Sequence, residues 1–274
     1  MPYANVNGAE IYYEIHGEGY PLLLIRGLGS NADHWYPQVP AFSRRYRVIV
    51  FDNRGIARSR DPGGSFTIGT MADDALGLLE ALSIPRAHVT ALSMGGMIAQ
   101  VLALSHPERL NGLVLACTHC GGEHAVRPSD DVRALMGRYI ATASPEDAAR
   151  AAPCLFTRKT LEEAQHLLRP YLEASARYRP SAEILQKQWT AIQGHDTWAG
   201  LPRIQAPTLV LTGDEDVLVP PENTKILAQR IPGAEALVIP GGAHQFLVER
   251  AEASNRAVLE VLESVDTGKM ERQG

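Results

Sequence analysis

Short apolar runs recur along the chain and are separated by segments with helical periodicity. The runs are LLLI at 22–25, VIVF at 48–51, HVTAL at 88–92, LVLA at 113–116, TLVL at 208–211 and ALVI at 236–239. They do not alternate with polar residues, which is typical of parallel strands buried on both faces. Between them, residues 70–82 carry leucines at helical spacing, and residues 94–105 are apolar nearly all round. The alternation predicts an α/β fold with a mostly parallel sheet covered by helices on both faces.

The stretch from 119 to 206 breaks this alternation. It is rich in Ala, Arg, Glu and Leu, has no convincing strand, and shows helical patterns near 129–141, 145–152, 160–174 and 181–193. Helices inserted between two strands of one sheet predict a helical cap. We therefore expect a core formed by residues 1–118 and 207–264, a cap insertion formed by 119–206, and a polar tail at 265–274.

The amino-terminal residues 3–17 have a third pattern. Two segments rich in Tyr, Ile and Val flank Asn7-Gly8, a pair that favours a tight turn between antiparallel strands. We expect a hairpin here.

Composition narrows the class of protein. Of the 274 residues, 45% are hydrophobic and 21% are charged, which excludes disorder, collagen and a small disulfide scaffold. The formal net charge is -5 and no dense basic run is present, so we expect neither nucleic acid nor an anionic membrane as a partner. Three cysteines, no secretory leader pattern and no apolar run of about 18 residues predict a cytoplasmic protein.

The sharpest local signal is the segment Ala91-Leu92-Ser93-Met94-Gly95-Gly96. An expected strand precedes it and an expected buried helix follows it. A serine between small residues at such a junction is typical of a nucleophile elbow, a strained turn that exposes the hydroxyl above the sheet. The usual pattern is G-x-S-x-G, and Ala91 keeps the first position small.

A serine hydroxyl needs an adjacent base that a third group orients. In this architecture the chain order is serine, acid, histidine. His244 follows the 236–239 run, at the sheet edge where open α/β folds bind ligands. The acid should follow the 208–211 run, where three carboxylates compete, namely Asp214, Glu215 and Asp216.

The segment Arg26-Gly27-Leu28-Gly29 follows the first long apolar run. Its glycines allow the backbone to bend, so that the Leu28 amide can face the site. The Met94 amide, at the start of the buried helix, would be the second donor of an oxyanion hole. The loop lacks the G-x-G-x-x-G spacing of dinucleotide-binding proteins, and we expect no cofactor.

These motifs together resemble the α/β-hydrolase fold over residues 3–264. The matching pieces are RGLGSNADHW, FDNRGIARS, ALSMGG, GDEDVLVP and GGAHQFLVE. The region from Gly27 to Pro107 is most similar to 3-oxoadipate enol-lactonases and related small carboxylesterases. The resemblance implies a Ser-Asp-His triad, no cofactor and a helical cap. It also implies that the acid is Asp216, at the D of G-x-x-D-x-x-x-P, with Asp214 as the reserve.

Two residues depart from that family pattern. Arg26 stands where the family usually has a histidine that braces the oxyanion loop, so the loop or the substrate preference should differ. Ala57 replaces a glycine in a structural loop, with no expected functional cost. Asp52 and Arg54 are expected to lock that loop together.

Further candidates carry weaker signals. Trp35 follows the oxyanion loop and is a candidate pocket wall, although a packing role fits equally well. His119, at the end of a strand, is a second pocket candidate. Cys117, His119 and Cys120 form a lone C-x-x-C segment without a second ligand pair, so we expect no metal site.

The sequence thus predicts a serine hydrolase that cleaves a small carboxylic ester or lactone. Two enzymatic alternatives share the same constellation, a C–C bond hydrolase of the diketone type and a cofactor-free haloperoxidase. A haloalkane dehalogenase would need a carboxylate at position 93. The non-enzymatic alternative is a ligand receptor that keeps the hydrolase fold. The oligomeric state and the cap residues that line the pocket are left open.

Overall fold

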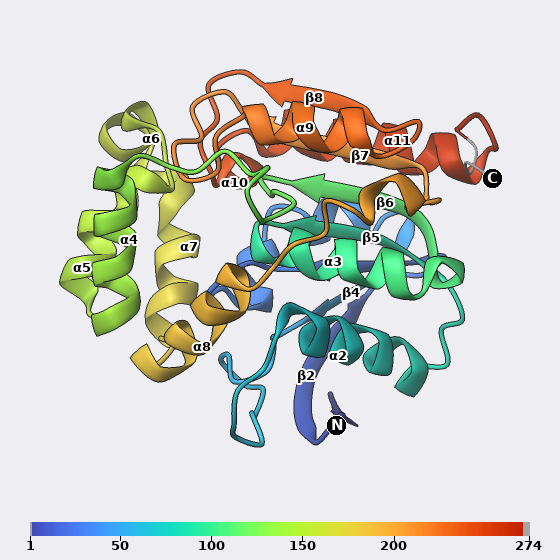
Figure 1. Ribbon diagram of the computed structural model, residues 1–274, viewed down its shortest axis with the longest axis horizontal. Coiled ribbons are helices and arrows are strands. Elements are labelled where there is room, and N and C mark those ends of the chain that lie inside the picture. The colour runs from blue at the N-terminus through green and yellow to red at the C-terminus, as the bar shows by residue number, and fades with distance from the viewer. Residues whose placement is uncertain (1, 271–274) are drawn as a thin grey trace.

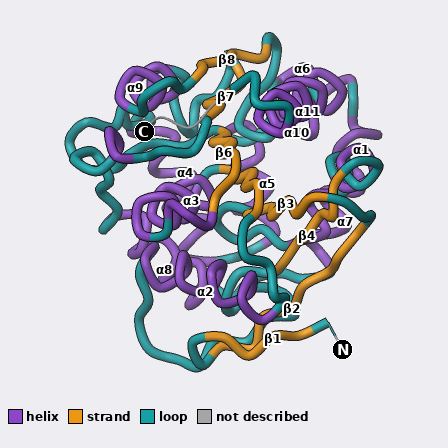
Figure 2. The backbone as a smooth tube through the Cα atoms, turned by 90° about the vertical axis from the view of Figure 1, so that its right-hand side faces the viewer, coloured by secondary structure: helices purple, strands orange, loops and turns teal. Residues whose placement is uncertain are grey.

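The computed structural model describes residues 2–270. One eight-stranded sheet runs through the molecule in the order β1-β2-β4-β3-β5-β6-β7-β8, and Figure 2 shows its twist from β8 to β1. The strands are β1 (Tyr3–Val6), β2 (Ala9–His16), β3 (Tyr20–Ile25), β4 (Tyr46–Phe51), β5 (Ala87–Leu92), β6 (Leu110–Ala116), β7 (Thr208–Gly213) and β8 (Glu235–Ile239). β2 pairs in antiparallel fashion with both β1 and β4, and all the other neighbouring strands pair in parallel. The predicted α/β-hydrolase architecture is confirmed.

The expected hairpin is the antiparallel edge of this sheet. Val6 pairs with Ala9, and Asn7 and Gly8 between them have φ values of 48° and 77°. Two consecutive positive φ angles belong to the turn type that matches strand twist, and Asn-Gly adopts them at low cost.

Side chains of each central strand enter two separate cores. Leu22 and Leu24 pack on one face of the sheet, whereas Leu23 and Ile25 pack on the other, and all four are fully buried. This double burial explains why the runs read as continuously apolar. The helices of the core are α1 (Val39–Phe42), α2 (Ile68–Ala81), α3 (Met94–Ser105), α9 (Glu222–Arg230), α10 (Phe246–Glu249) and α11 (Ala251–Asp266).

Five α-helices lie between β6 and β7 and gather beyond one end of the sheet (Figure 1). They are α4 (Asp130–Thr142), α5 (Pro145–Ala151), α6 (Arg158–Glu163), α7 (Gln165–Arg177) and α8 (Ala182–Gln193). Four of them begin at a Ser or Thr whose side chain accepts a hydrogen bond from a backbone N–H of the first turn. The pattern at 160–174 resolves into two helices, which meet at Ala164.

The carboxy-terminal helix is longer than the sequence pattern indicated. Val265 and Asp266, assigned above to the polar tail, form the last turn of α11. The Asp266 carboxylate accepts hydrogen bonds of 2.9 Å from both Tyr46 Oη and His88 Nε2, which hold this turn against the core. Residues 271–274 of the predicted tail lie outside the described residues.

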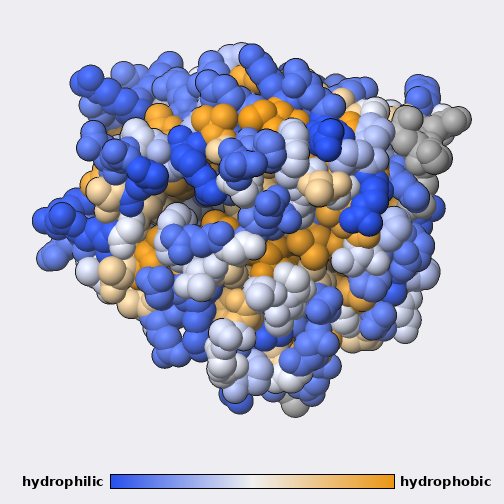
Figure 3. All heavy atoms as spheres, in the orientation of Figure 1, coloured by the Kyte–Doolittle hydropathy of each residue, from blue (hydrophilic) through white to orange (hydrophobic). Residues whose placement is uncertain are grey.

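The distribution of hydrophilic and apolar residues on the surface is typical of a globular protein, as the composition predicts. On the face shown in Figure 3, hydrophilic side chains form most of the outline, and apolar ones show mainly in recesses between them. Within residues 2–270, no helix has both the length and the apolar character needed to cross a membrane.

Candidate active site

Ser93 occupies a strained turn between β5 and α3. Its φ is 59° and its ψ is -122°, a conformation that costs free energy for any residue with a side chain. A methyl group on Gly95 would collide with the carbonyl oxygen of Ile25, and one on Gly96 would lie 2.6 Å from Thr118 Cβ. The small residues after Ser93 therefore let α3 pack directly against the neighbouring strands.

His244 and Asp216 form a buried pair at the same edge of the sheet. His244 Nδ1 lies 2.9 Å from Asp216 Oδ2, and both side chains are almost fully buried. The other carboxylate oxygen of Asp216 accepts hydrogen bonds from the backbone amides of Leu218 and Val219, at 2.9 and 2.8 Å. These two bonds fix the orientation of the carboxylate. Because Asp216 engages Nδ1, Nε2 is the His244 nitrogen that can act on a ligand.

The neighbouring carboxylates have other surroundings. Asp214 is exposed and accepts hydrogen bonds from the backbone amides of Gly241 (2.6 Å) and Gly242 (3.3 Å). Asp214 therefore holds the loop that leads to His244, and it does not contact the imidazole. Glu215 is exposed as well.

The predicted oxyanion loop passes directly over the serine. A Cβ atom built on Gly27 would lie 2.9 Å from Ser93 Cβ and 3.4 Å from its Oγ. The loop is held from the cap, because the Gly29 amide donates a 2.8 Å hydrogen bond to Gln188 Oε1. Within residues 2–270, the Leu28 amide has no acceptor, and the Met94 amide, in the first turn of α3, has none either.

Ser93 and His244 line one cavity of about 330 Å³ that the cap covers. Its wall is mostly apolar, and Arg179 is the only permanently charged side chain among the described residues that line it. The cap contributes mainly small or apolar residues, namely Met136, Tyr139, Ala143, Pro145, Ala148, Ala149, Ala151, Ala152, Leu155, Phe156, Tyr171, Leu172, Ala176 and Pro180. The cavity therefore suits an uncharged or anionic ligand with an apolar part.

The exposed members of this wall mark its opening. Pro145 and Ala149 on α5 and Leu172 and Ala176 on α7 line the cavity and are solvent-exposed, as is Arg179 just after α7. The mouth thus lies between α5 and α7.

Neither aromatic candidate named from the sequence lines this cavity. Trp35 is fully buried in the core beneath the loop, with its ring 4.8 Å from Arg26 Cζ. His119 Nδ1 accepts a 3.0 Å hydrogen bond from the Gly121 amide. Burial, together with the nearby His195, lowers the pKa of His119 to about 3, so it is neutral at ordinary pH. Both side chains are buried outside the cavity wall, so the structure does not support either residue as a pocket wall.

Within residues 2–270, Cys117 and Cys120 do not share a cluster of potential metal ligands. The cluster that the geometry brings together is Cys117, Asp216 and His244, whose potential ligand atoms lie within 4.8 Å of one another. Burial, followed by the Asp216 charge, raises the pKa of the Cys117 thiol well above its usual value. The Cys117 side chain is buried and its Sγ lies 3.6 Å from Thr212 Oγ1, so Cys117 is packed beside the His244–Asp216 pair.

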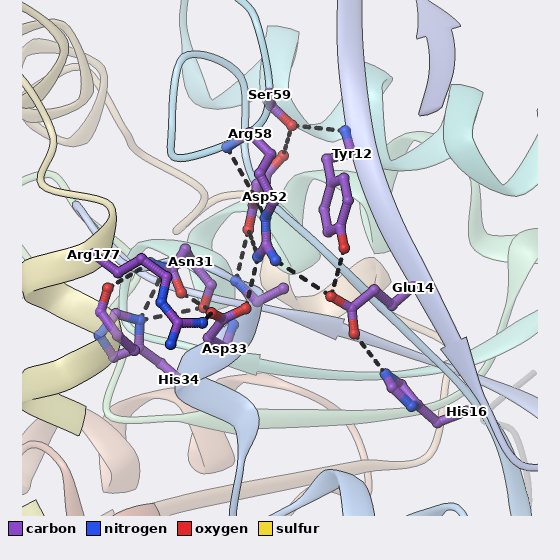
Figure 4. A network of polar contacts seen from close by, with 12 residues as sticks. Tyr12, Glu14, His16, Asn31, Asp33, His34, Asp52, Arg58, Ser59 and Arg177 are labelled. Carbon is purple, nitrogen blue, oxygen red and sulfur yellow. Dashed lines mark hydrogen bonds and ion pairs between the residues drawn. The ribbon is translucent and has the colours of Figure 1, made fainter. Parts of the chain in front are cut away.

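A network of charges locks the loops around the site (Figure 4). The Asp52 carboxylate accepts from the Ala32 amide (2.7 Å) and from Arg58 Nε (2.7 Å), and Arg58 also pairs with Asp33 at 2.8 Å. On the other side of Asp33, Arg177 of α7 approaches to 3.9 Å. The network joins the segment after the oxyanion loop to the cap.

Arg54 belongs to a separate lock. It donates two hydrogen bonds of 2.6 Å to Asp74 on α2. Neither Asp52 nor Arg54 lines the cavity; each holds the 52–59 loop through its own partners, Asp52 within the loop and Arg54 to α2, so the two residues do not form one lock.

The fold and this cavity define a class of protein. The model of the alpha/beta hydrolase fold family matches residues 20–251, and the chain belongs to that family. It is 32% identical to a protein of Azorhizobium caulinodans named "Putative carbamate hydrolase RutD", over 97% of this chain and 100% of that one.

Solved structures give the same picture. The enol-lactonase from Burkholderia xenovorans LB400 superposes with a TM-score of 0.85 at 31% identity, covering 96% of this chain and 100% of that one. Est816, described as an N-acyl homoserine lactone degrading enzyme, matches with a TM-score of 0.81 at 31% identity, covering 94% and 99%. The predicted likeness to enol-lactonases is confirmed at this level.

Proposed function

We propose that this protein is a serine hydrolase that cleaves a carboxylic ester or lactone through an acyl-enzyme. One observation carries the proposal: Ser93 and His244 line a single cavity, and His244 is hydrogen-bonded through Nδ1 to the buried Asp216. A serine, a base within the same cavity and a carboxylate that orients the base are the parts that nucleophilic acyl transfer needs.

The mechanism follows from these positions. His244 Nε2 removes the Ser93 proton as Oγ attacks the carbonyl carbon. The negative charge that develops on the carbonyl oxygen is held by the Leu28 and Met94 amides, each of which is worth roughly 100- to 1000-fold in rate in comparable sites. Asp216 stabilises the imidazolium, which then protonates the leaving alcohol oxygen. Water activated by the same imidazole releases the acid and restores Ser93.

A lactone uses the same steps, except that its leaving group stays attached to the acyl part. The mostly apolar wall supports an ester or lactone with an apolar portion, since that portion loses contact with water on binding. The likeness to an enol-lactonase and to a lactone-degrading enzyme supports the same substrate class.

Carbamates are a second candidate substrate. The observation in their favour is the 32% identity, over nearly the whole chain, to a protein whose name gives that activity. A carbamate presents the same kind of carbonyl to Ser93, but its acyl-enzyme or product carries nitrogen. Release of an amine or ammonia, followed beside release of alcohol from esters, separates the two activities.

A fluorophosphonate probe tests the class of enzyme directly. The purified protein should lose activity as the probe attaches to Ser93, with one phosphonyl group per chain by mass spectrometry. Hydrolysis of p-nitrophenyl acetate should disappear in parallel. A protein that binds a ligand without turnover, or that leaves Ser93 unlabelled, would be a receptor or another kind of enzyme.

A further inference from the structure

A buried arginine lies beneath the oxyanion loop without an acidic partner. Arg26 is fully buried, and no carboxylate of the described chain lies within 4.0 Å of its guanidinium. Its Nη2 donates a 2.9 Å hydrogen bond to Gln245 Oε1, whereas Nε and Nη1 have no acceptor within 3.5 Å in residues 2–270, and the Tyr171 hydroxyl is a polar neighbour of the guanidinium. A buried cation without a counter-ion lowers the stability of the fold, so a functional role is a reason to examine for Arg26.

Gln245 connects that arginine to the cavity. It follows His244 directly and lines the cavity wall. Its backbone is held from both sides, because its amide donates to Leu155 O (2.8 Å) and its carbonyl accepts from the Val248 amide (2.7 Å). The position of Gln245 is therefore set by the core and the cap together.

Arg26 also determines which end of the Gln245 amide is free. A guanidinium only donates hydrogen bonds, so it selects the orientation in which Oε1 faces it. The Gln245 Nε2 group is then the remaining end. It has no acceptor in the described part of the chain and, unlike Arg26 Nε and Nη1, it is not fully enclosed by protein, as expected of a group that borders the cavity. An amide N–H₂ on a mostly apolar wall, beside His244, is a donor that awaits an oxygen.

We propose that Gln245 is a specificity-determining residue whose Nε2 donates a hydrogen bond to a second oxygen of the substrate, beyond the scissile carboxyl group. Arg26 is the positioning residue that orients and polarises this amide. The inference rests on the proposed function and narrows it to esters or lactones that carry a further acceptor oxygen. A site with a buried donor rejects an analogue that leaves the donor unpaired.

Matched substrates test the proposal. One series is p-nitrophenyl hexanoate with its 3-, 4- and 5-oxo analogues and the p-nitrophenyl monoester of adipic acid. A second series compares butyl and 2-methoxyethyl butyrate, which places the extra oxygen on the alcohol side. The wild-type enzyme should prefer at least one oxygenated member by roughly 2- to 10-fold in kcat/KM if the oxygen is neutral, and by roughly 10- to 100-fold if it is a carboxylate.

Variants of Gln245 and Arg26 test whether these two residues cause the preference for oxygenated substrates. Gln245→Met should abolish it, and Arg26→Met should reduce it, with little further loss in the double variant because the two residues act as one unit. Gln245→Glu keeps an acceptor for Arg26 but removes the donor, so the preference should stay lost. If Gln245 only braced the loop, Glu would restore wild-type behaviour.

The matched control is Gln100→Met, which removes another buried amide that lies outside the cavity and donates to His119 O. It should lower kcat/KM for all substrates alike. Two outcomes would overturn this inference alone, provided that the fluorophosphonate still labels Ser93. In one, the wild-type enzyme shows no preference for any oxygenated substrate; in the other, Gln245→Met lowers kcat/KM equally for the oxygenated and the plain substrates. Failure to label Ser93 would instead overturn the proposed function, and this inference with it.

Discussion

The core and the cap build one cavity by different means. In the core, each side chain of the candidate triad follows the end of a strand, and backbone geometry fixes it, as the φ of Ser93 and the two amides on Asp216 show. In the cap, the wall consists largely of alanines and other small or apolar residues from separate helices. The core thus places reacting groups accurately, whereas the cap mainly sets the shape and polarity of the space beside them.

The largest expected effect concerns the acid of the core. Asp216→Asn should lower kcat/KM by about 10⁴-fold, because an amide cannot hold His244 in the required tautomer. Steady-state hydrolysis of p-nitrophenyl acetate measures the loss. Asp214→Asn is the matched control and should cost far less, since Asp214 contacts only the amides of Gly241 and Gly242. The opposite ranking would transfer the role to Asp214.

Replacing one glycine by alanine in each region compares how well the core and the cap tolerate an added methyl group. Gly95→Ala should destabilise the protein by about 3 kcal/mol, because the new methyl group meets the Ile25 carbonyl oxygen. Gly137→Ala in α4 should stabilise it by about 0.5–1 kcal/mol, since nothing lies within 4 Å of the new methyl and alanine is the better helix former. Urea unfolding of both variants measures these changes. Equal effects would show that the elbow is not tightly packed.

The junction of core and cap should be sensitive to acid. Burial lowers the pKa of His119 to about 3 and that of His195 to about 4, against about 6.5 for an unfolded chain. Because the unfolded chain binds the protons more readily, the stability that these neutral rings contribute is complete above pH 6.5. It is lost as the pH falls toward 4, by about 1 kcal/mol per pH unit for each ring.

Urea unfolding at pH 7, 6 and 5 tests this dependence. His195→Gln should flatten the decline, because it removes one buried titrating group. His166→Gln, at an exposed position of α7, should leave the slope unchanged. A wild-type protein equally stable from pH 7 to 5 would contradict the expectation.

The smallest expected effect is a change in substrate chain-length preference, caused by a substitution in the cap. Ala148→Leu should fill part of the cavity and lower kcat/KM for p-nitrophenyl hexanoate relative to the acetate by roughly 10-fold. Fluorophosphonate labelling of Ser93 should persist, because the core is untouched. Ala141→Leu, on the exposed side of α4 and outside the cavity wall, is the control and should keep the wild-type ratio.

Local sequence determined much of this protein. Apolar runs of the central strands, the Asn7-Gly8 turn and the small residues around Ser93 each restrict the backbone over a few residues, so the α/β class could be predicted from them. His244 and the carboxylates at 214–216 could be placed at one edge of the sheet because parallel strands bring their carboxyl ends together.

Tertiary structure decided the rest. The residues alone left three carboxylates open, and the family resemblance favoured Asp216, but which one contacts His244 depends on how two distant loops meet. Trp35 and His119 lie near the motifs of the site in sequence yet are buried outside the cavity wall, whereas Tyr171 enters that wall from the cap, far from those motifs in the chain. The physical reason is that local pattern sets the conformation of an element, while membership of a cavity depends on packing between elements far apart in sequence.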